Sequence, residues 1–252
     1  MTLPPSIAPR RAADLLADPG ALRTWITRYG EYHGSTRFPV ASALAFKAYT
    51  WALIEVAVGR WVTERRVVDV SSACVSMRTE LADEPRLEFR SLHYTVLSDD
   101  PMAGQSGVAV VATEQELLEV LRCTLVENHL APAVEAFRAL RGGGPRPLWG
   151  TVAQSIGYPA ATADPTFLPD RAATVHRLLS ILPEGAAQLV EIAELDEGQG
   201  WRPLLLRRTC CYAYTLPAYG QPCLTCCLLD DAGRDAVAAE DQVSWRRCDS
   251  CG

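Results

Sequence analysis

The residues with the clearest chemical potential are cysteines. Five of the nine lie within eighteen residues, and they are Cys210, Cys211, Cys223, Cys226 and Cys227. Four thiolates that converge on one point are what a tetrahedral zinc ion or an iron–sulfur cluster requires, because the thiolate is the ligand and the metal lowers the thiol pKa. Pro217, Gly220 and Pro222 turn the chain between the two groups of cysteines. We therefore expect the groups to meet and to bind a metal.

The two groups place different demands on the backbone. In Cys223-Leu224-Thr225-Cys226, two intervening residues allow a tight turn that puts both sulfur atoms on one side. Cys210 and Cys211 are adjacent, and successive side chains of a regular strand point to opposite faces. These two thiols can share a site only if the backbone there is irregular.

Length and composition favour metal binding over disulfide formation. The chain has 252 residues, 48% of them hydrophobic, which is enough to bury a core without disulfides. No apolar run follows the arginines of MTLPPSIAPRRAADLLADPG, so we expect no signal peptide. We accordingly place the protein in the reducing cytoplasm, where clustered thiols more often bind metal. Cys74 and Cys123 fall on apolar segments and are interpreted as small buried hydrophobic residues.

Two partner classes are disfavoured. The apolar run at residues 38–59 approaches the length of a membrane span, but Lys47 and Glu55 interrupt it, so a core helix is expected and stable membrane insertion is not. With 30 acidic and 24 basic residues, the chain has a formal net charge of −6. Nucleic acid is an unfavourable partner for such a chain, because binding it normally requires a basic face.

The remaining pattern predicts an α+β fold. Helices are expected at residues 11–30 and in the apolar run, and short strands with a small antiparallel sheet between residues 66 and 111. A capping box at Thr113 and Glu116 begins a long helix with a kink near Pro132. The expected class is a mainly helical single domain with a C-terminal cysteine-rich iron–sulfur segment. Residues 1–200 and 201–252 are expected to form one continuous globular unit, in which the first part interacts with a siderophore.

A family resemblance rests on the cysteine motif. The stretch LLLRRTCCYAYTLPAYGQPCLTCCL resembles the signature of the FhuF-like ferric-siderophore reductases, and PLWGTVAQSI and FPVASALAFKAYTWALIEVAVGRWV resemble further segments of that family. The resemblance implies a [2Fe–2S] cluster whose ligands are Cys210, Cys211, Cys223 and Cys226. The family pattern has ten residues between the inner cysteines, whereas this chain has eleven. Cys227 is then a neighbouring thiol that can exchange with Cys226.

The resemblance also implies an activity. The protein would reduce Fe(III) in a ferric siderophore, of the hydroxamate type, by one electron and so release Fe(II). No flavin or nicotinamide motif is present, so electrons would come from a ferredoxin or an NAD(P)H-dependent reductase. Arg207 and Arg208 would stabilise the reduced cluster or are plain surface charges, and Trp149 lines a siderophore pocket or packs in the core. These three residues are the candidate substrate-binding residues.

Two alternatives stay open. Cys211, Cys223, Cys226 and one of Cys248 or Cys251 could close a structural zinc site in a protein that docks a partner. A related [2Fe–2S] protein of a biosynthetic pathway would keep the cluster and serve another reaction. Cys248 and Cys251 form a second C-x-x-C, interpreted as a free dithiol, a ligand pair for another metal, an electron-relay pair or a frayed tail.

Overall fold

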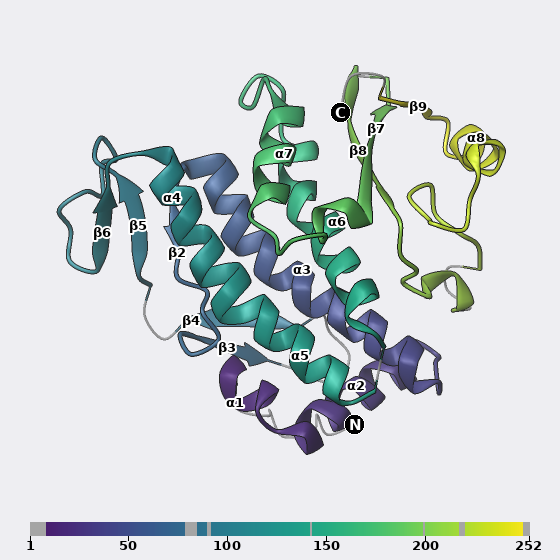
Figure 1. Cartoon of the computed structure of the whole chain (residues 1–252), viewed down its shortest axis with the longest axis horizontal. Coiled ribbons are helices and arrows are strands. Elements are labelled where there is room, and N and C mark those ends of the chain that lie inside the picture. Colours follow the sequence, from purple (N-terminus) through teal and green to yellow (C-terminus); the bar gives the residue numbers. More distant parts are fainter. Residues whose placement is uncertain are drawn as a thin grey trace, which may run out of the picture. The chain divides into compact units, whose positions relative to one another are not determined.

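The computed structural model describes residues 9–78, 85–89, 92–141, 143–198, 200–216 and 220–248. The chain divides into two compact units, Met1–Gly143 and Gly144–Gly252, which are considered separately. Helices predominate in the secondary structure, with small sheets beside them (Figure 1). The predicted α+β class, mainly helical, is confirmed.

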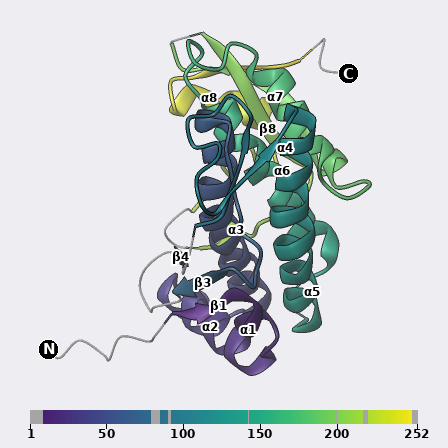
Figure 2. The same ribbon diagram turned by 90° about the vertical axis from the view of Figure 1, so that its left-hand side faces the viewer.

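The first unit combines long helices with two small sheets. Its helices are α1 (Ala12–Leu16), α2 (Pro19–Tyr32), α3 (Phe38–Glu64), α4 (Glu114–Leu121), the π-helix η1 (Arg122–Leu130) and α5 (Ala131–Ala139). Its strands are β1 (Arg10–Arg11), β2 (Val67–Val68), β3 (Val75–Arg78), β4 (Arg86–Phe89), β5 (Tyr94–Leu97) and β6 (Val108–Val111). One sheet has the order β1-β3-β4, beside α1 and α2 (Figure 2), and the other has the order β2-β5-β6. The sequence predicted one small antiparallel sheet in this region, whereas the structure has two, and the β5–β6 pair is parallel.

The apolar run forms α3, the central helix of this unit. Among the described residues it is the one helix long and apolar enough to cross a membrane, and 61% of its most apolar window is buried within the protein. Phe46, Tyr49 and Leu53 have no solvent exposure, while Lys47 and Glu55 are exposed. The two charged residues that interrupt the apolar run therefore lie on the solvent side of a helix that packs in a core.

A continuous helical rod from α4 through η1 to α5 runs beside α3 (Figure 1). It begins with the predicted capping box, in which the Glu116 amide donates to Thr113 Oγ1 at 3.2 Å and the Glu116 carboxylate accepts from the Thr113 amide at 3.1 Å. Pro132 has no N–H for the Asn128 carbonyl. That carbonyl accepts instead from the amide and hydroxyl of Ser72, at 3.1 and 2.9 Å. The irregularity predicted near Pro132 takes the form of the wider π-helical turns that precede it.

A buried aromatic cluster holds α3 against the rod. The Tyr49 hydroxyl lies 2.5 Å from Nε2 of His129, and the other ring nitrogen of His129 bonds the Val70 carbonyl. Trp25 and Phe137 pack around Tyr49 with ring centroids about 6 Å away. His129 has no solvent exposure, and burial lowers its pKa to about 4. The imidazole is therefore neutral and serves as a hydrogen-bonded part of the core.

The second unit is built on one antiparallel sheet of order β8-β7-β9. Its elements are α6 (Pro145–Ala161), α7 (Arg171–Ser180), the 3-10 turn η2 (Ala187–Leu189), β7 (Val190–Asp196), β8 (Trp201–Arg207), the 3-10 turn η3 (Ala213–Thr215), α8 (Asp231–Glu240) and β9 (Ser244–Arg247). Gly157 of α6 packs directly on Leu205 of β8. Leu204 and Leu206 share a buried cluster with Ala238 of α8. Because side chains alternate along a strand, α6 and α8 cover opposite faces of this sheet.

The cysteine-rich segment belongs to this second unit. Gly200 and Trp201, on either side of the boundary expected at residues 200 and 201, lie where the chain passes from β7 to β8 in one hairpin. The sheet that leads into the cysteines therefore begins before that boundary, at Val190.

We expect acid to destabilise the first unit through His129. The pKa of His129 is about 4 in the folded state, against 6.5 for an ordinary histidine. Between these pH values only the unfolded chain takes up the proton, so the free energy of unfolding should fall as the pH drops from 6.5 to 4, by about 3 kcal/mol in full. Urea unfolding followed by near-UV circular dichroism at several pH values measures this loss.

His129→Gln is the informative variant, because glutamine offers a donor and an acceptor but does not titrate in this range. It should flatten the pH dependence, whereas His176→Gln, at an exposed histidine of the second unit, should leave it unchanged. An equally steep pH dependence in His129→Gln would contradict the assignment.

Candidate metal centre

The first cysteine group follows directly on the end of β8. Residues 208 to 212 have no regular secondary structure, and Tyr212 has a φ of 59°, in the left-handed region that residues other than glycine adopt uncommonly. The Tyr212 amide donates to Cys210 Sγ at 3.3 Å. The backbone is thus irregular here, which is the condition for Cys210 and Cys211 to share one site. An N–H···S bond of this kind is one of the features that tune thiolate–metal centres.

Close packing against α6 fixes the residue before this group. A Cβ atom on Gly150 would lie 2.0 Å from Oγ1 of Thr209, so only glycine allows the two backbones to approach this closely. Thr209 is buried, and its hydroxyl has no hydrogen-bond partner. Its backbone carbonyl accepts from Arg207 Nε at 3.4 Å. The start of the cysteine motif is thus anchored on a helix that begins more than fifty residues earlier in the chain.

The second cysteine group forms a tight turn anchored to the sheet. The Cys226 amide donates to the Cys223 carbonyl at 2.8 Å, which confirms the predicted turn. The Arg207 amide donates to the Thr225 carbonyl at 3.0 Å, so the turn pairs with the end of β8. Leu224 points into the buried cluster that includes Leu206. The backbone and a side chain therefore both hold this turn beside the first cysteine group.

The thiols of the two groups influence one another. Burial raises the pKa of Cys227 to about 11, and the negative charges of Cys210, Cys226 and Cys211 add to this effect. Burial also raises the pKa of Cys226, with smaller contributions from Cys223, Cys211 and Cys210. Arg207 lies three residues before Cys210, and the hydrogen bond from its amide to the Thr225 carbonyl keeps the two groups near each other. A thiol with such a pKa stays protonated at neutral pH unless a metal displaces the proton.

The sulfur atoms share one neighbourhood without forming a coordination sphere. Within the described ranges, no three His, Cys, Asp or Glu side chains are placed to hold a metal ion together. All five thiols of the motif are free, and their exposure differs: Cys223 is exposed, Cys226 is buried, and the other three are partly buried. The thiol donors that such a centre needs are present in the motif, but the structure does not bring them together around one point.

Arg207 introduces a buried positive charge beside these thiols. Only 3% of its surface is exposed. Its guanidinium donates to Thr151 Oγ1 at 2.8 Å, to Gln154 Oε1 at 2.9 Å and to the Thr209 carbonyl. All three acceptors are neutral, and in the described part of the chain no carboxylate lies within ion-pair distance of Arg207. Its charge lowers the pKa of Cys227. A buried cation without an anionic partner is unfavourable, so an anion at the thiol site would stabilise it.

The other two candidate substrate-binding residues lie in different surroundings. Arg208 is largely exposed and forms an ion pair with Glu191 at 3.5 Å. Trp149 is half-buried at the start of the second turn of α6, next to Gly150. Arg207 and Arg208 line the same cavity as Cys227, and Trp149 does not. The sequence treated the two arginines as equivalent, whereas the structure separates a buried guanidinium from a surface ion pair.

Sequence reasoning missed Arg234 of α8. Its side chain is 7% exposed, and Nη2 donates to the Cys226 carbonyl at 3.1 Å. The guanidinium also lies 5.6 Å from the ring of Trp245 on β9. The available signal was the pattern of α8, where Arg234 and Ala238 fall four residues apart on the side that packs on the sheet. An arginine on the buried side of a short helix is a reason to look for an acceptor or an anion.

The last cysteine pair is only partly described. Cys248 follows β9 and is disulfide-bonded, so it has no free thiol to bind a metal in this structure. Cys251 lies outside the described residues. The alternative zinc site that uses Cys248 would require this disulfide to be reduced.

The chain was also compared with known proteins. Neither the models of known protein families nor the curated proteins contain a match to it.

We expect Gly150→Ala to destabilise the second unit. The added methyl group would overlap Thr209, and relief requires α6 and the cysteine segment to move apart, at a cost of about 1–3 kcal/mol. The loss should appear in the free energy of unfolding measured with denaturant. Gly59→Ala is the matched control, because Gly59 also lies within a helix but has nothing within 4 Å of the new Cβ. The control should be neutral or slightly stabilising, and an equal loss in both variants would contradict the close contact.

Proposed function

We propose that this protein is an iron–sulfur ferric-siderophore reductase that acts in the cytoplasm. The observation that carries the proposal is the buried Arg207 guanidinium, which lacks a carboxylate partner in the described residues and lines the same cavity as Cys227, one of five free thiols of the motif. A [2Fe–2S] cluster with four thiolates has a formal charge of about −2 and would provide the missing anion. The resemblance of the cysteine motif to the FhuF-like reductases supports iron and sulfide rather than another metal.

The proposed ligands are Cys210, Cys211, Cys223 and Cys226. A cluster held by these residues would supply one-electron chemistry between a ferredoxin or an NAD(P)H-dependent reductase and the Fe(III) of the substrate. Siderophores hold Fe(III) through hard oxygen ligands and hold Fe(II) much more weakly, so one electron is enough to release the metal. Cys223 is exposed and would provide a ligand at the protein surface, where a substrate could approach the cluster.

The protein residues have distinct proposed roles in this reaction. Arg207 would stabilise the more negative, reduced state, because its charge is buried and little screened by water. The Tyr212 amide and the Arg234 guanidinium would fix Cys210 Sγ and the Cys226 carbonyl, respectively. Arg208 would contribute less, since Glu191 offsets its charge.

We expect the anaerobically purified protein to contain two irons and two acid-labile sulfides per chain, and to be red-brown. Cys211→Ser and Cys223→Ser should lose the cluster and the reductase activity, because a serine oxygen is a poor ligand for this iron. Cys74→Ser and Cys123→Ser are the matched controls and should retain both. Stoichiometric zinc in a colourless protein would overturn the proposal in favour of the zinc-binding alternative, and bleaching by Cys74→Ser would overturn the ligand set.

The fourth ligand can be tested with two neighbouring variants. Cys226→Ala should lose the cluster or bind it weakly with a shifted spectrum, because Cys226 closes the tight turn that begins at Cys223. Cys227→Ala should keep the cluster, with a modest change of reduction potential from the lost neighbouring thiol. Iron content and visible spectra of both proteins decide between them. An unshifted cluster in Cys226→Ala, together with cluster loss in Cys227→Ala, would reverse the assignment.

A further inference from the structure

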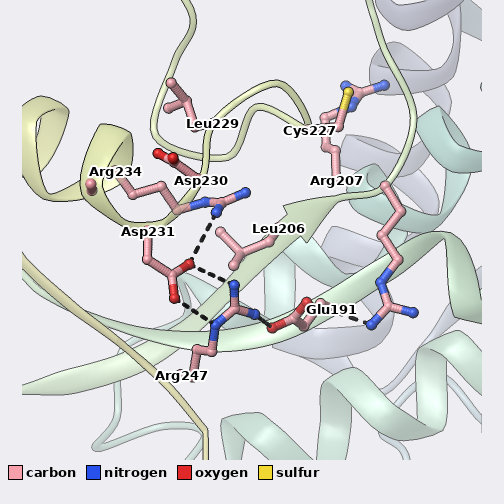
Figure 3. A pocket seen from close by; sticks show the side chains of 11 residues that line it. Glu191, Leu206, Arg207, Cys227, Leu229, Asp230, Asp231, Arg234 and Arg247 are labelled. Carbon is pink, nitrogen blue, oxygen red and sulfur yellow. Dashed lines mark hydrogen bonds and ion pairs between the residues drawn. The ribbon is translucent and has the colours of Figure 1, made fainter.

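A cavity of about 650 Å³ opens beside Cys227, between the end of β8, the first turn of α8 and the end of β9 (Figure 3). Four arginines line it: Arg207, Arg208, Arg234 and Arg247. We call it the arginine cavity. Arginine is the side chain best suited to hold carboxylate or phosphate groups, because its planar guanidinium donates two parallel hydrogen bonds.

The carboxylates of the arginine cavity are already engaged. Arg247 bonds Asp231 at 2.6 Å and also bonds Glu191, which lies 3.5 Å from Arg208 (Figure 3). Asp231 lies 3.5 Å from Arg234 as well. Asp230, the third carboxylate in the lining, accepts from the Gly233 amide at 2.8 Å as the N-cap of α8. Four arginines thus face three carboxylates, and Arg207 has no carboxylate partner among the described residues, so the lining carries one net positive charge.

Arg234 carries an unmet hydrogen-bond donor. Its side chain is 7% exposed, and its guanidinium reaches from α8 into the arginine cavity, between Asp230 and Leu206 (Figure 3). The Nε atom is buried and has no hydrogen-bond partner. Leaving a buried donor unpaired costs about 1–3 kcal/mol, so a ligand oxygen placed here would remove a penalty that the unbound protein bears.

The first turn of α8 also favours an anion. The ten-residue helix runs Asp231–Glu240, and its N-terminal residues line the arginine cavity. Backbone amides at a helix N-terminus carry a partial positive charge. The carboxylates of Asp230 and Asp231 offset part of this positive charge. The unpaired Nε–H of Arg234 is a further donor that an anion could use.

We propose that the arginine cavity binds an anionic ferric chelate, one whose iron ligands or free groups include carboxylates, with the metal next to Cys227. This inference rests on the proposed function, because it takes the substrate to be a ferric chelate. A ferric complex of three hydroxamates is neutral and gives the buried, unpaired Arg234 Nε no charged oxygen to bind. A ferric hydroxycarboxylate complex carries both the iron and a negative charge, so it matches this lining better than the hydroxamate type expected from the sequence.

Gallium(III) citrate is a suitable probe, since Ga(III) resembles Fe(III) in charge and size but is not reduced. Isothermal titration of the full-length protein should show binding of gallium citrate at least about ten times tighter than binding of the neutral gallium complex of a linear trihydroxamate. Citrate without metal should bind more weakly than gallium citrate. Raising the salt concentration should weaken gallium citrate binding, as for any partly exposed charged contact.

Two neighbouring arginines of β9 provide a matched pair of variants. Arg247→Gln should weaken gallium citrate binding about tenfold, the loss typical of one charged hydrogen-bonding partner. Arg246→Gln removes the same charge one residue away, but Arg246 lies over the Trp201 ring at 4.1 Å, pairs with Glu194 and does not line the cavity. The affinity of Arg246→Gln for gallium citrate should stay within about twofold of that of the unaltered protein. Arg208→Gln is a second lining variant for use if Arg247→Gln does not fold.

Equal losses in Arg246→Gln and Arg247→Gln would overturn the proposal, as would equal affinity for the neutral and anionic gallium complexes or for citrate with and without metal. These outcomes are separable from failure of the proposed function. Gallium binding requires no electron transfer, so Arg247-dependent binding by a protein without an iron–sulfur cluster would keep the anion site and remove the reductase. If the protein contains an iron–sulfur cluster and reduces ferric chelates, but gallium citrate binding does not depend on Arg247, the reductase stands and the anion site is wrong.

Discussion

The interaction on which the second unit depends is the burial of Arg207 at the end of β8. Its side chain reaches α6 through Thr151 and Gln154, while its backbone amide holds the Thr225 carbonyl. One residue therefore connects the sheet, a covering helix and the turn that carries the second cysteine group. Three neutral acceptors satisfy its donors but leave its charge uncompensated. Burying a charge in this way is costly, and Cys227 lines the same cavity as Arg207.

Local signals in the sequence were sufficient for the local parts of the site. The two residues between Cys223 and Cys226 predicted the turn. The adjacency of Cys210 and Cys211 gave the condition for a shared site, an irregular backbone, and both conclusions depend only on neighbouring residues. The capping box at Thr113 was predictable for the same reason. The π-helical form of the segment before Pro132 was not predictable from neighbouring residues. There the Asn128 carbonyl accepts hydrogen bonds from Ser72, which lies more than fifty residues earlier in the chain.

Long-range pairings were beyond the sequence pattern. Strand β9 is four residues long and pairs with β7, some fifty residues earlier, so nothing in its own composition distinguished it from a loop. Arg234 and Arg247 line the site because α8 and β9, which carry them, pack beside it. The sequence motif therefore predicted the thiols but not the arginines around them. For the fold, the α+β class was easier to predict than the number of sheets.

The two halves of the cysteine motif are anchored separately, and this has a consequence for variation among related chains. Thr209 fixes the first half through its contact with Gly150, and Leu224 and the Thr225 carbonyl fix the second half on the sheet. The spacing of the halves in space is then set by the sheet and α6 rather than by the number of residues that join them. Insertions and deletions between the halves should be close to neutral in evolution, because lengthening a surface connection by one residue costs little entropy. The eleven residues between Cys211 and Cys223 are then not a fixed requirement of the site, whereas a side chain at position 150 would be selected against.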